Sequence, residues 1–120
     1  MSLFKVTVTA ASPQTPEKNT PGIEALVDTG SELTWLPADA LADAGIKRMR
    51  KKQFQTAKRQ LITRDIGYAI VRAEGHETID EIVFAEPSDM VLLGVRSIEG
   101  FAVTVDNLGH RFIAVASLVV

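Results

Sequence analysis

The sequence predicts an all-β domain, folded as a closed or partly open barrel with one or two short helices. Apolar and polar residues alternate with a period of two along most of the chain, and β-branched residues are frequent in these stretches. Turn-forming residues separate one stretch from the next. A chain of 120 residues is long enough for one core and too short for two lobes, so a single domain is expected over residues 1–120.

Strands are expected wherever this alternation is clear. The first covers residues 3–10, and a proline-containing surface loop separates it from the second at residues 23–27. Further strands are expected at residues 33–36, 46–57, 60–73, 78–85 and 91–94. Residues 102–105 and 110–115 flank a turn over residues 106–109, in which Gly109 is expected to have a positive φ.

Two short segments favour helix. Residues 37–44 are rich in helix formers, start with Pro37 in the first turn and are followed by Gly45. Residues 95–100 have room for one or two helical turns. Both segments are too short to change the expected fold class.

Composition excludes several classes of function. A content of 46% apolar and 23% charged residues with a net charge of −2 is ordinary for a soluble protein and requires no nucleic-acid partner. The absence of cysteine rules out a disulfide framework, thiolate catalysis and zinc ribbons. No segment approaches the roughly 18 apolar residues of a membrane span, and no signal pattern opens the chain, so a cytoplasmic protein without a membrane partner is expected.

No metal site or cofactor is expected. His76 is placed in a turn with Gly75, and His110 at the start of a strand. Neither histidine has a second ligand at the spacing of a metal motif. Asp65, Asp80, Asp89 and Asp106 are interpreted as turn or surface acids.

Asp28 is the strongest candidate for chemistry. It ends the apolar segment Ala25-Leu26-Val27 and is followed by Thr29, Gly30 and Ser31. A tight loop that holds a carboxylate at the rim of a core positions that group for use. The tripeptide alone also fits an ordinary polar turn between strands, so the flanking residues decide its interpretation.

With its apolar flanks on both sides, the segment that begins at Asp28 resembles the active-site motif of the retropepsin-like aspartic proteases, especially their small prokaryotic members. A second segment, Leu92-Leu93-Gly94 followed by a short helical stretch, is similar to the family motif that lies beside the catalytic loop. The resemblance covers nearly the whole chain. It implies a retropepsin-like closed β-barrel that works as a homodimer.

The resemblance also implies an activity and residue roles. One Asp28 from each subunit would activate a water that hydrolyses a peptide bond, with no cofactor. Thr29 would form a hydrogen bond across the dimer, Gly30 would line the floor of the cleft, and Ser31 would support the outer carboxylate oxygen. The terminal segments at residues 4–8 and 113–120 would interleave with those of the second copy. The alternative is that both termini cover their own barrel.

Members of this family cover the cleft with a β-hairpin, the flap, and residues 46–73 occupy the corresponding position here. The tip would comprise Thr56, Ala57, Lys58, Arg59 and Gln60, without the glycine that is usual there. Two interpretations remain open. Either the turn is longer and of type I, or the flap is stiffer and the substrate unusual.

Basic residues gather around the expected flap: Lys47, Arg48, Arg50, Lys51, Lys52, Lys58, Arg59 and Arg64. They would attract acidic peptides, or as a lesser alternative nucleic acid, to the cleft, or they would serve as the solvated edge charges of an exposed hairpin. Trp35 is expected in the core, with a role as a substrate platform as the alternative.

Two other functions compete with proteolysis. The first is a catalytically weak or inactive dimer of the same fold, which would bind a peptide as an added strand. The second is a phosphate-binding loop at Asp28, as in actin-like kinases. That fold needs far more chain, and no second phosphate loop is present.

Overall fold

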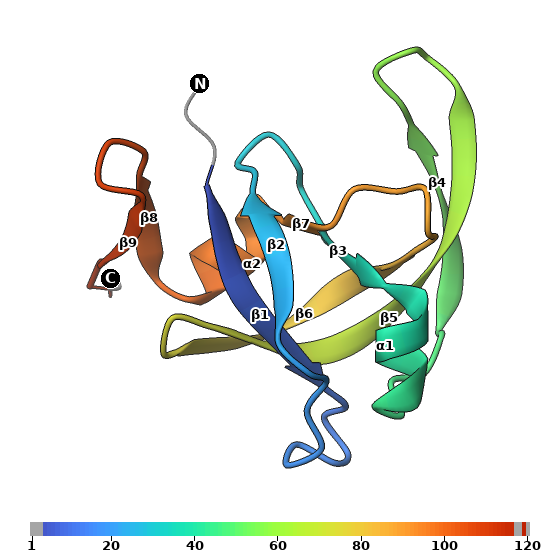
Figure 1. Ribbon diagram of the computed structural model, residues 1–120, viewed down its shortest axis with the longest axis horizontal. Coiled ribbons are helices and arrows are strands. Elements are labelled where there is room, and N and C mark those ends of the chain that lie inside the picture. The colour runs from blue at the N-terminus through green and yellow to red at the C-terminus, as the bar shows by residue number, and fades with distance from the viewer. Residues whose placement is uncertain (1–3, 117–118, 120) are drawn as a thin grey trace.

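The computed structural model describes residues 4–116 and 119 (Figure 1). Its strands are β1 (Lys5–Ala11), β2 (Ile23–Val27), β3 (Thr34–Pro37), β4 (Arg50–Gln55), β5 (Leu61–Ala73), β6 (His76–Ala85), β7 (Leu92–Leu93), β8 (Val103–Asp106) and β9 (Arg111–Ala114). Its helices are α1 (Ala38–Asp43) and α2 (Val95–Gly100). The expected mostly-β fold with two short helices is therefore confirmed.

Seven of the strands form one sheet in the order β1-β2-β7-β3-β6-β5-β4, and β1 also pairs with β5. Residues 5–8 of β1 pair with β2, and residues 8–11 pair with β5. Strand pairing thus runs from β1 through β2, β7, β3, β6 and β5 back to β1. The hairpin of β4 and the first half of β5 extends beyond this circuit, and β8 and β9 form a separate two-stranded sheet (Figure 1).

The core lies inside the circuit of strands. Along β1, Val6, Val8 and Ala10 are buried while Lys5 and Thr7 are exposed, which is the alternation that the sequence predicts. Leu36, Leu41, Phe84 and Leu93 are among the side chains buried with them. Burial of each large apolar side chain contributes about 1.5–3 kcal/mol to folding. A smaller cluster of Leu33, Ile66 and Val83 lies toward the β4–β5 hairpin, with Trp35 and Phe54 packed against it.

The sequence predicted a strand from residue 46, directly after α1, but the structure has no strand over the first residues of that range. Ile46 is buried, and its N–H donates to the carbonyl of Leu41 in α1, so it completes the end of the helix. β4 begins only at Arg50. Gly45 has a φ of 79°, which agrees with its expected place just after the helix.

Two expected turns differ in detail. Glu74 and Gly75 form the two-residue turn between β5 and β6, both with positive φ, and His76 is the first residue of β6 and pairs with Ala73. The placement of His76 in the turn was therefore wrong. In the β8–β9 turn the positive φ belongs to His110 (52°) and not to Gly109. Asp106 accepts hydrogen bonds from the N–H groups of residues 108 and 109, so the chain reverses before Gly109 and the left-handed step falls on the next residue.

The expected start of the first strand at residue 3, and residues 117, 118 and 120 of the C-terminal segment, lie outside the described residues. Neither helix in the described part is long and apolar enough to cross a membrane.

Candidate active site

Asp28 and the segment Leu92-Leu93-Gly94 lie side by side. β2 and β7 are parallel neighbours, with Val27 opposite Leu93. The N–H of Asp28 donates to the carbonyl of Leu93 at 3.0 Å, which continues the pairing one residue past the end of β2. The structure thus brings together two segments that the sequence separates by more than sixty residues (Figure 1).

The carboxylate of Asp28 is fixed by its own loop. Its Oδ1 atom accepts a hydrogen bond from the N–H of Gly30 at 2.9 Å. A Cβ atom on residue 30 would lie 3.1 Å from this oxygen, so glycine gives the carboxylate room. Asp28 itself is half-buried, whereas Thr29 and Gly30 are exposed. The acid therefore lies at the surface end of a buried strand.

Ser31 does not support the carboxylate of Asp28, contrary to expectation. Its hydroxyl donates to the carbonyl of Leu33 at 2.8 Å, and its N–H donates to the carbonyl of Asp28 at 3.2 Å. Both bonds satisfy groups within the turn, and the single hydroxyl proton, given to Leu33, is not donated to the carboxylate. Ser31 shapes the loop, and the support of Asp28 comes from the backbone of Gly30.

The loop that carries Asp28 also caps α2. The first N–H groups of a helix have no partner within it, and no side chain caps α2. The N–H of Val95 donates to the carbonyl of Ser31 at 2.8 Å, and that of Arg96 donates to the carbonyl of Glu32 at 3.1 Å. Carbonyl groups of the loop therefore provide the hydrogen-bond acceptors for the first N–H groups of the helix.

Gly94 is required by the closeness of the two segments. A Cβ atom at this position would lie 2.4 Å from the carbonyl oxygen of Leu33, far inside van der Waals contact. The N–H of Gly94 donates to the Thr34 hydroxyl at 3.0 Å. The last residue of the second motif is thus clamped against the chain that leaves the Asp28 loop.

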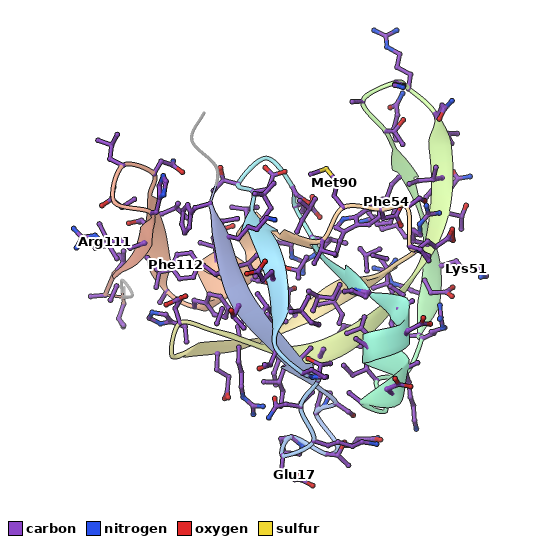
Figure 2. The ribbon with its side chains drawn as sticks, viewed as in Figure 1. Glu17, Lys51, Phe54, Met90, Arg111 and Phe112 are labelled. Atoms are coloured by element: carbon purple, nitrogen blue, oxygen red, sulfur yellow. The ribbon has the colours of Figure 1, made fainter. Side chains whose placement is uncertain are left out.

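A pocket of about 530 Å³ opens beside Asp28. Leu33 and Trp35 line it, together with Phe54 and Ile62 of the β4–β5 hairpin. The pocket is also lined by Gly30, Ser31, Glu32, Gln55, Thr56, Ala57, Asp89, Met90 and Leu92. Figure 2 shows Phe54 on the inner side of the hairpin and Lys51 on its outer side. The hairpin therefore turns an apolar side toward Asp28.

Trp35 combines features of a core residue with those of a residue that lines the pocket. It is partly buried, packs against the Leu33 cluster, and lies with its ring centroid 4.8 Å from that of Phe54. The expected core position is thus confirmed in part, because Trp35 packs against a core cluster and also lines the pocket. Phe54 and Met90 were missed from the sequence. Phe54 could have been found as the one aromatic residue on the inner face of a basic, alternating strand.

The hairpin tip holds itself together. The N–H of Thr56 donates to the carbonyl of Gln60 at 2.8 Å, and the N–H of Arg59 donates to the carbonyl of Thr56 at 2.9 Å. Ala57, Lys58 and Arg59 lie between the paired residues, so the turn is longer than two residues, as one of the two interpretations held. Arg59 has a φ of 61°, in the left-handed position that glycine usually occupies in such hairpins.

Half of the basic residues near the hairpin have acidic partners. Asp65 binds both Arg48 at 2.7 Å and Lys51 at 3.0 Å. These hydrogen bonds, first from Lys51 and then from Arg48, lower the pKa of Asp65. Arg50 binds Glu81 at 2.7 Å. The interpretation as edge charges of a hairpin therefore accounts for these cations.

Asp89 lines the pocket, but its carboxylate is already bound by other groups of the protein. Arg64 donates to both of its oxygens, at 2.6 Å and 2.8 Å, and the N–H of Glu86 donates to one of them at 2.8 Å. The hydrogen bond from Arg64 is the main reason that the pKa of Asp89 is lowered, although burial opposes the shift. An acid held ionised in this way is unsuited to donate a proton.

The two histidines lie in an aromatic cluster that joins the β8–β9 sheet to the rest of the molecule. The ring of His110 stacks on that of Phe4 at 5.3 Å, and His76 lies 5.9 Å from Phe101. Phe112 of β9 points toward β1 in this cluster (Figure 2). Within the described part of the chain, no group of three histidine or acidic side chains is arranged to hold a metal ion.

No protein-family model and no curated protein matches the chain. The functional interpretation therefore rests on its motifs and on the geometry described above.

Proposed function

We propose that the chain is one subunit of a homodimeric aspartic endopeptidase of the retropepsin-like type. The observation that carries this proposal is the placement of Asp28 on a loop clamped to Leu92-Leu93-Gly94, beside a pocket that is also lined by the β4–β5 hairpin. In this proposal the hairpin is the flap. The circuit of strand pairing from β1 back to β1 supports the corresponding closed barrel.

The second catalytic carboxylate has to come from another copy. Two other acids line the pocket, and both have cationic neighbours: Asp89 is bound by Arg64, and Glu32 lies 3.9 Å from Arg96. Thr29 and Gly30 are exposed beside Asp28, which leaves this surface free to meet the same surface of a second chain. A two-fold axis there would bring the two Asp28 side chains together.

The chemistry follows from that pairing. Two carboxylates a few ångströms apart share one proton, as is known for the dyads of aspartic proteases. The ionised carboxylate takes a proton from a water as the water oxygen attacks the peptide carbonyl carbon, and the protonated one gives its proton to the carbonyl oxygen. The tetrahedral intermediate then collapses as the amide nitrogen accepts a proton and leaves. No cofactor and no covalent enzyme intermediate are needed.

The substrate would be an extended peptide held between floor and flap. Apolar side chains of the peptide would contact Trp35 and Phe54. Lys52, Lys58 and Arg59 form no ion pair in the described part of the chain. They keep open the hypothesis that acidic residues near the scissile bond are preferred. A cleavage-site profile that is indifferent to Asp and Glu would refute that preference.

A dimer of the same fold that binds peptides without cleaving them is the second candidate. The specific observation in its favour is the flap tip, where Arg59 stands in the left-handed position. A tip without glycine has fewer conformations with which to open and close over a substrate. This candidate predicts peptide binding by the dimer and no turnover.

The test is cleavage of a diverse peptide library by the purified protein from acidic to neutral pH. Asp28→Asn should abolish cleavage and leave the fold intact, because the amide keeps the shape of the side chain but cannot exchange the shared proton. A statine-type inhibitor should also block the parent protein. Asp43→Asn, at an exposed position on α1, is the matched control and should cleave at the parent rate. Cleavage by Asp28→Asn near the parent rate would place the active carboxylate elsewhere, and a folded dimer that binds but never cleaves would favour the second candidate.

A further inference from the structure

A buried chain of hydrogen bonds connects Asp80 of β6 with the backbone of Gly94. The Ser97 hydroxyl donates to Asp80 Oδ2 at 2.9 Å, the hydroxyls of Ser97 and Thr34 lie 2.7 Å apart, and Thr34 Oγ1 accepts from the N–H of Gly94 at 3.0 Å. Thr34 and Ser97 are fully buried, and Asp80 is 8% exposed. The expectation that Asp80 is a turn or surface acid was therefore wrong.

The two ends of this chain fix the direction of every bond in it. A backbone N–H can only donate, and an ionised carboxylate can only accept. The Thr34 hydroxyl, which accepts from Gly94, must therefore donate to Ser97, and Ser97 must donate to Asp80. Only an acceptor at position 80 lets both hydroxyls and the N–H of Gly94 be satisfied at once.

A buried carboxylate such as Asp80 is energetically unfavourable as the last acceptor in this chain of hydrogen bonds. Burial raises its pKa, while the hydrogen bonds from Ser97 and the N–H of Glu81 and the charge of Arg96 oppose that shift. Arg96 on α2, at 3.8 Å, and Glu81, the next residue along β6, are the charged groups that act on it. A raised pKa means that the folded state binds the proton more tightly than the unfolded state, so ionisation of Asp80 lowers stability as pH rises above its unfolded value. The charge on Asp80 is therefore a cost to stability at neutral pH that its hydrogen bonds only partly offset.

We propose that Asp80 is a positioning residue for the Asp28 loop. Through Ser97 and Thr34 it holds the N–H of Gly94 in place, and Gly94 is the residue against which the Leu33 carbonyl of that loop rests. The catalytic consequence rests on the proposed function. The structural consequence, a clamped Gly94, does not.

Asp80→Asn tests the proposal because it changes one acceptor into a donor with little change in shape. If the new NH₂ group faces Ser97, Ser97 must donate to Thr34, and the Thr34 hydroxyl loses its acceptor. If it faces the other way, it meets the N–H of Glu81, which donates to Asp80 Oδ1 at 2.7 Å. The first arrangement reverses the order of the hydrogen bonds, and the second keeps that order but leaves the N–H of Glu81 facing another donor.

The first readout is hydrogen exchange at the amide of Gly94, which does not depend on proteolysis. Exchange should be at least about tenfold faster in Asp80→Asn than in the parent, because the acceptor is no longer held. Glu77→Gln, which removes an exposed carboxylate from the same strand, is the control and should leave this amide unchanged. Ser97→Ala should reproduce the faster exchange, and it keeps the test open if Asp80→Asn does not fold.

The second readout is turnover. The kcat of Asp80→Asn should fall about tenfold or more with KM nearly unchanged, since a displaced loop misplaces Asp28 in the transition state. Thr34→Val should show the same loss, and Thr34→Ser, which keeps the hydroxyl, should recover most of it. A purely structural role would lower the melting temperature but leave kcat per folded molecule unchanged.

The outcomes separate the two proposals. Unchanged exchange at Gly94 in both Asp80→Asn and Ser97→Ala would overturn the role of Asp80, whatever the activity. Faster exchange with unchanged kcat would overturn the positioning of Asp28 and leave only a structural clamp. A parent protein that cleaves no peptide would refute the proposed function. The exchange measurement would then still show whether Asp80 holds Gly94 in place.

Discussion

The Asp28 loop and the flap tip are both turns at the surface, yet they are held in different ways. The loop is bound to Leu93, Val95 and Arg96, which lie more than sixty residues away in sequence. The tip, at residues 56–60, is closed only by hydrogen bonds between its own residues. In the proposed protease, the catalytic loop would thus have long-range support, and the hairpin tip that would move over a substrate has local support alone.

Gly94→Ala should break this comparison most strongly. The added methyl group would lie 2.4 Å from the Leu33 carbonyl oxygen, so the loop or α2 has to move. We expect the free energy of unfolding to fall by about 3 kcal/mol or more. Any catalytic activity should be lost as well. Denaturant unfolding measures the loss of stability. Gly45→Ala is the control: its methyl group meets nothing within 4 Å, and it should cost only the left-handed strain of about 1–2 kcal/mol. Equal losses for the two variants would show that Gly94 is not clamped.

Asp89→Asn tests an ion pair at the base of the flap. The pKa of Asp89 is lowered, so its pairing with Arg64 stabilises the fold fully above the unfolded value of about 3.8 and is lost as pH falls below it. We expect the variant to be about 2 kcal/mol less stable than the parent at neutral pH, with the difference shrinking in acid. Thermal unfolding from pH 2 to 7 provides the comparison. A difference that stays constant, or grows in acid, would contradict the assigned pairing.

Phe54→Ala should loosen the flap without disturbing the Asp28 loop. The ring lies 4.8 Å from that of Trp35, and such pairs contribute about 0.5–1.5 kcal/mol beyond the burial of their area. We expect a loss of about 1–2 kcal/mol in stability and a KM for peptides raised about tenfold. Gln53→Ala, on the opposite face of the same strand, should change neither quantity. A fall in kcat at constant KM would show that Phe54 acts on the loop after all.

Arg59→Gly should have the smallest effect and should sharpen the comparison at the tip. Glycine removes the strain of a φ of 61°, and the added freedom of the unfolded chain offsets part of the gain. We expect a stability increase of about 0.5 kcal/mol in denaturant unfolding, with no change at the Asp28 loop. Lys58→Gly, next to it, should be slightly destabilising. A loss of stability in Arg59→Gly would mean that the arginine side chain has contacts that matter more than its backbone strain.

The sequence was informative where local pattern decides the structure. Alternation along residues 3–10 and 60–73 predicted strands, and the setting of Asp28 after an apolar strand predicted a carboxylate at a rim. Where tertiary contacts decide, the pattern failed. In β6, Asp80 is buried and Ile79 is 64% exposed, the reverse of what hydropathy suggests, because Ser97 and Arg96 of α2 supply partners for the buried acid.

The partners of charged residues were equally hidden. Arg64 and Asp89 are 25 residues apart, and nothing local in the sequence indicates that they bind each other. The sequence alone therefore did not show that half of the basic residues near the flap are paired with acidic residues. The same limit applies to Ser31, whose hydroxyl had a choice between a carboxylate and a carbonyl that only the folded loop resolves.

The most direct test of the account is a mixing experiment with the parent chain and Asp28→Asn, refolded together at several ratios and assayed for peptide cleavage. If each active site needs one Asp28 from each of two copies, activity should follow the square of the parent fraction, so an equal mixture keeps about a quarter of the parent activity. Activity proportional to the parent fraction, about half in the equal mixture, would mean that a single Asp28 suffices and would contradict the paired-aspartate mechanism.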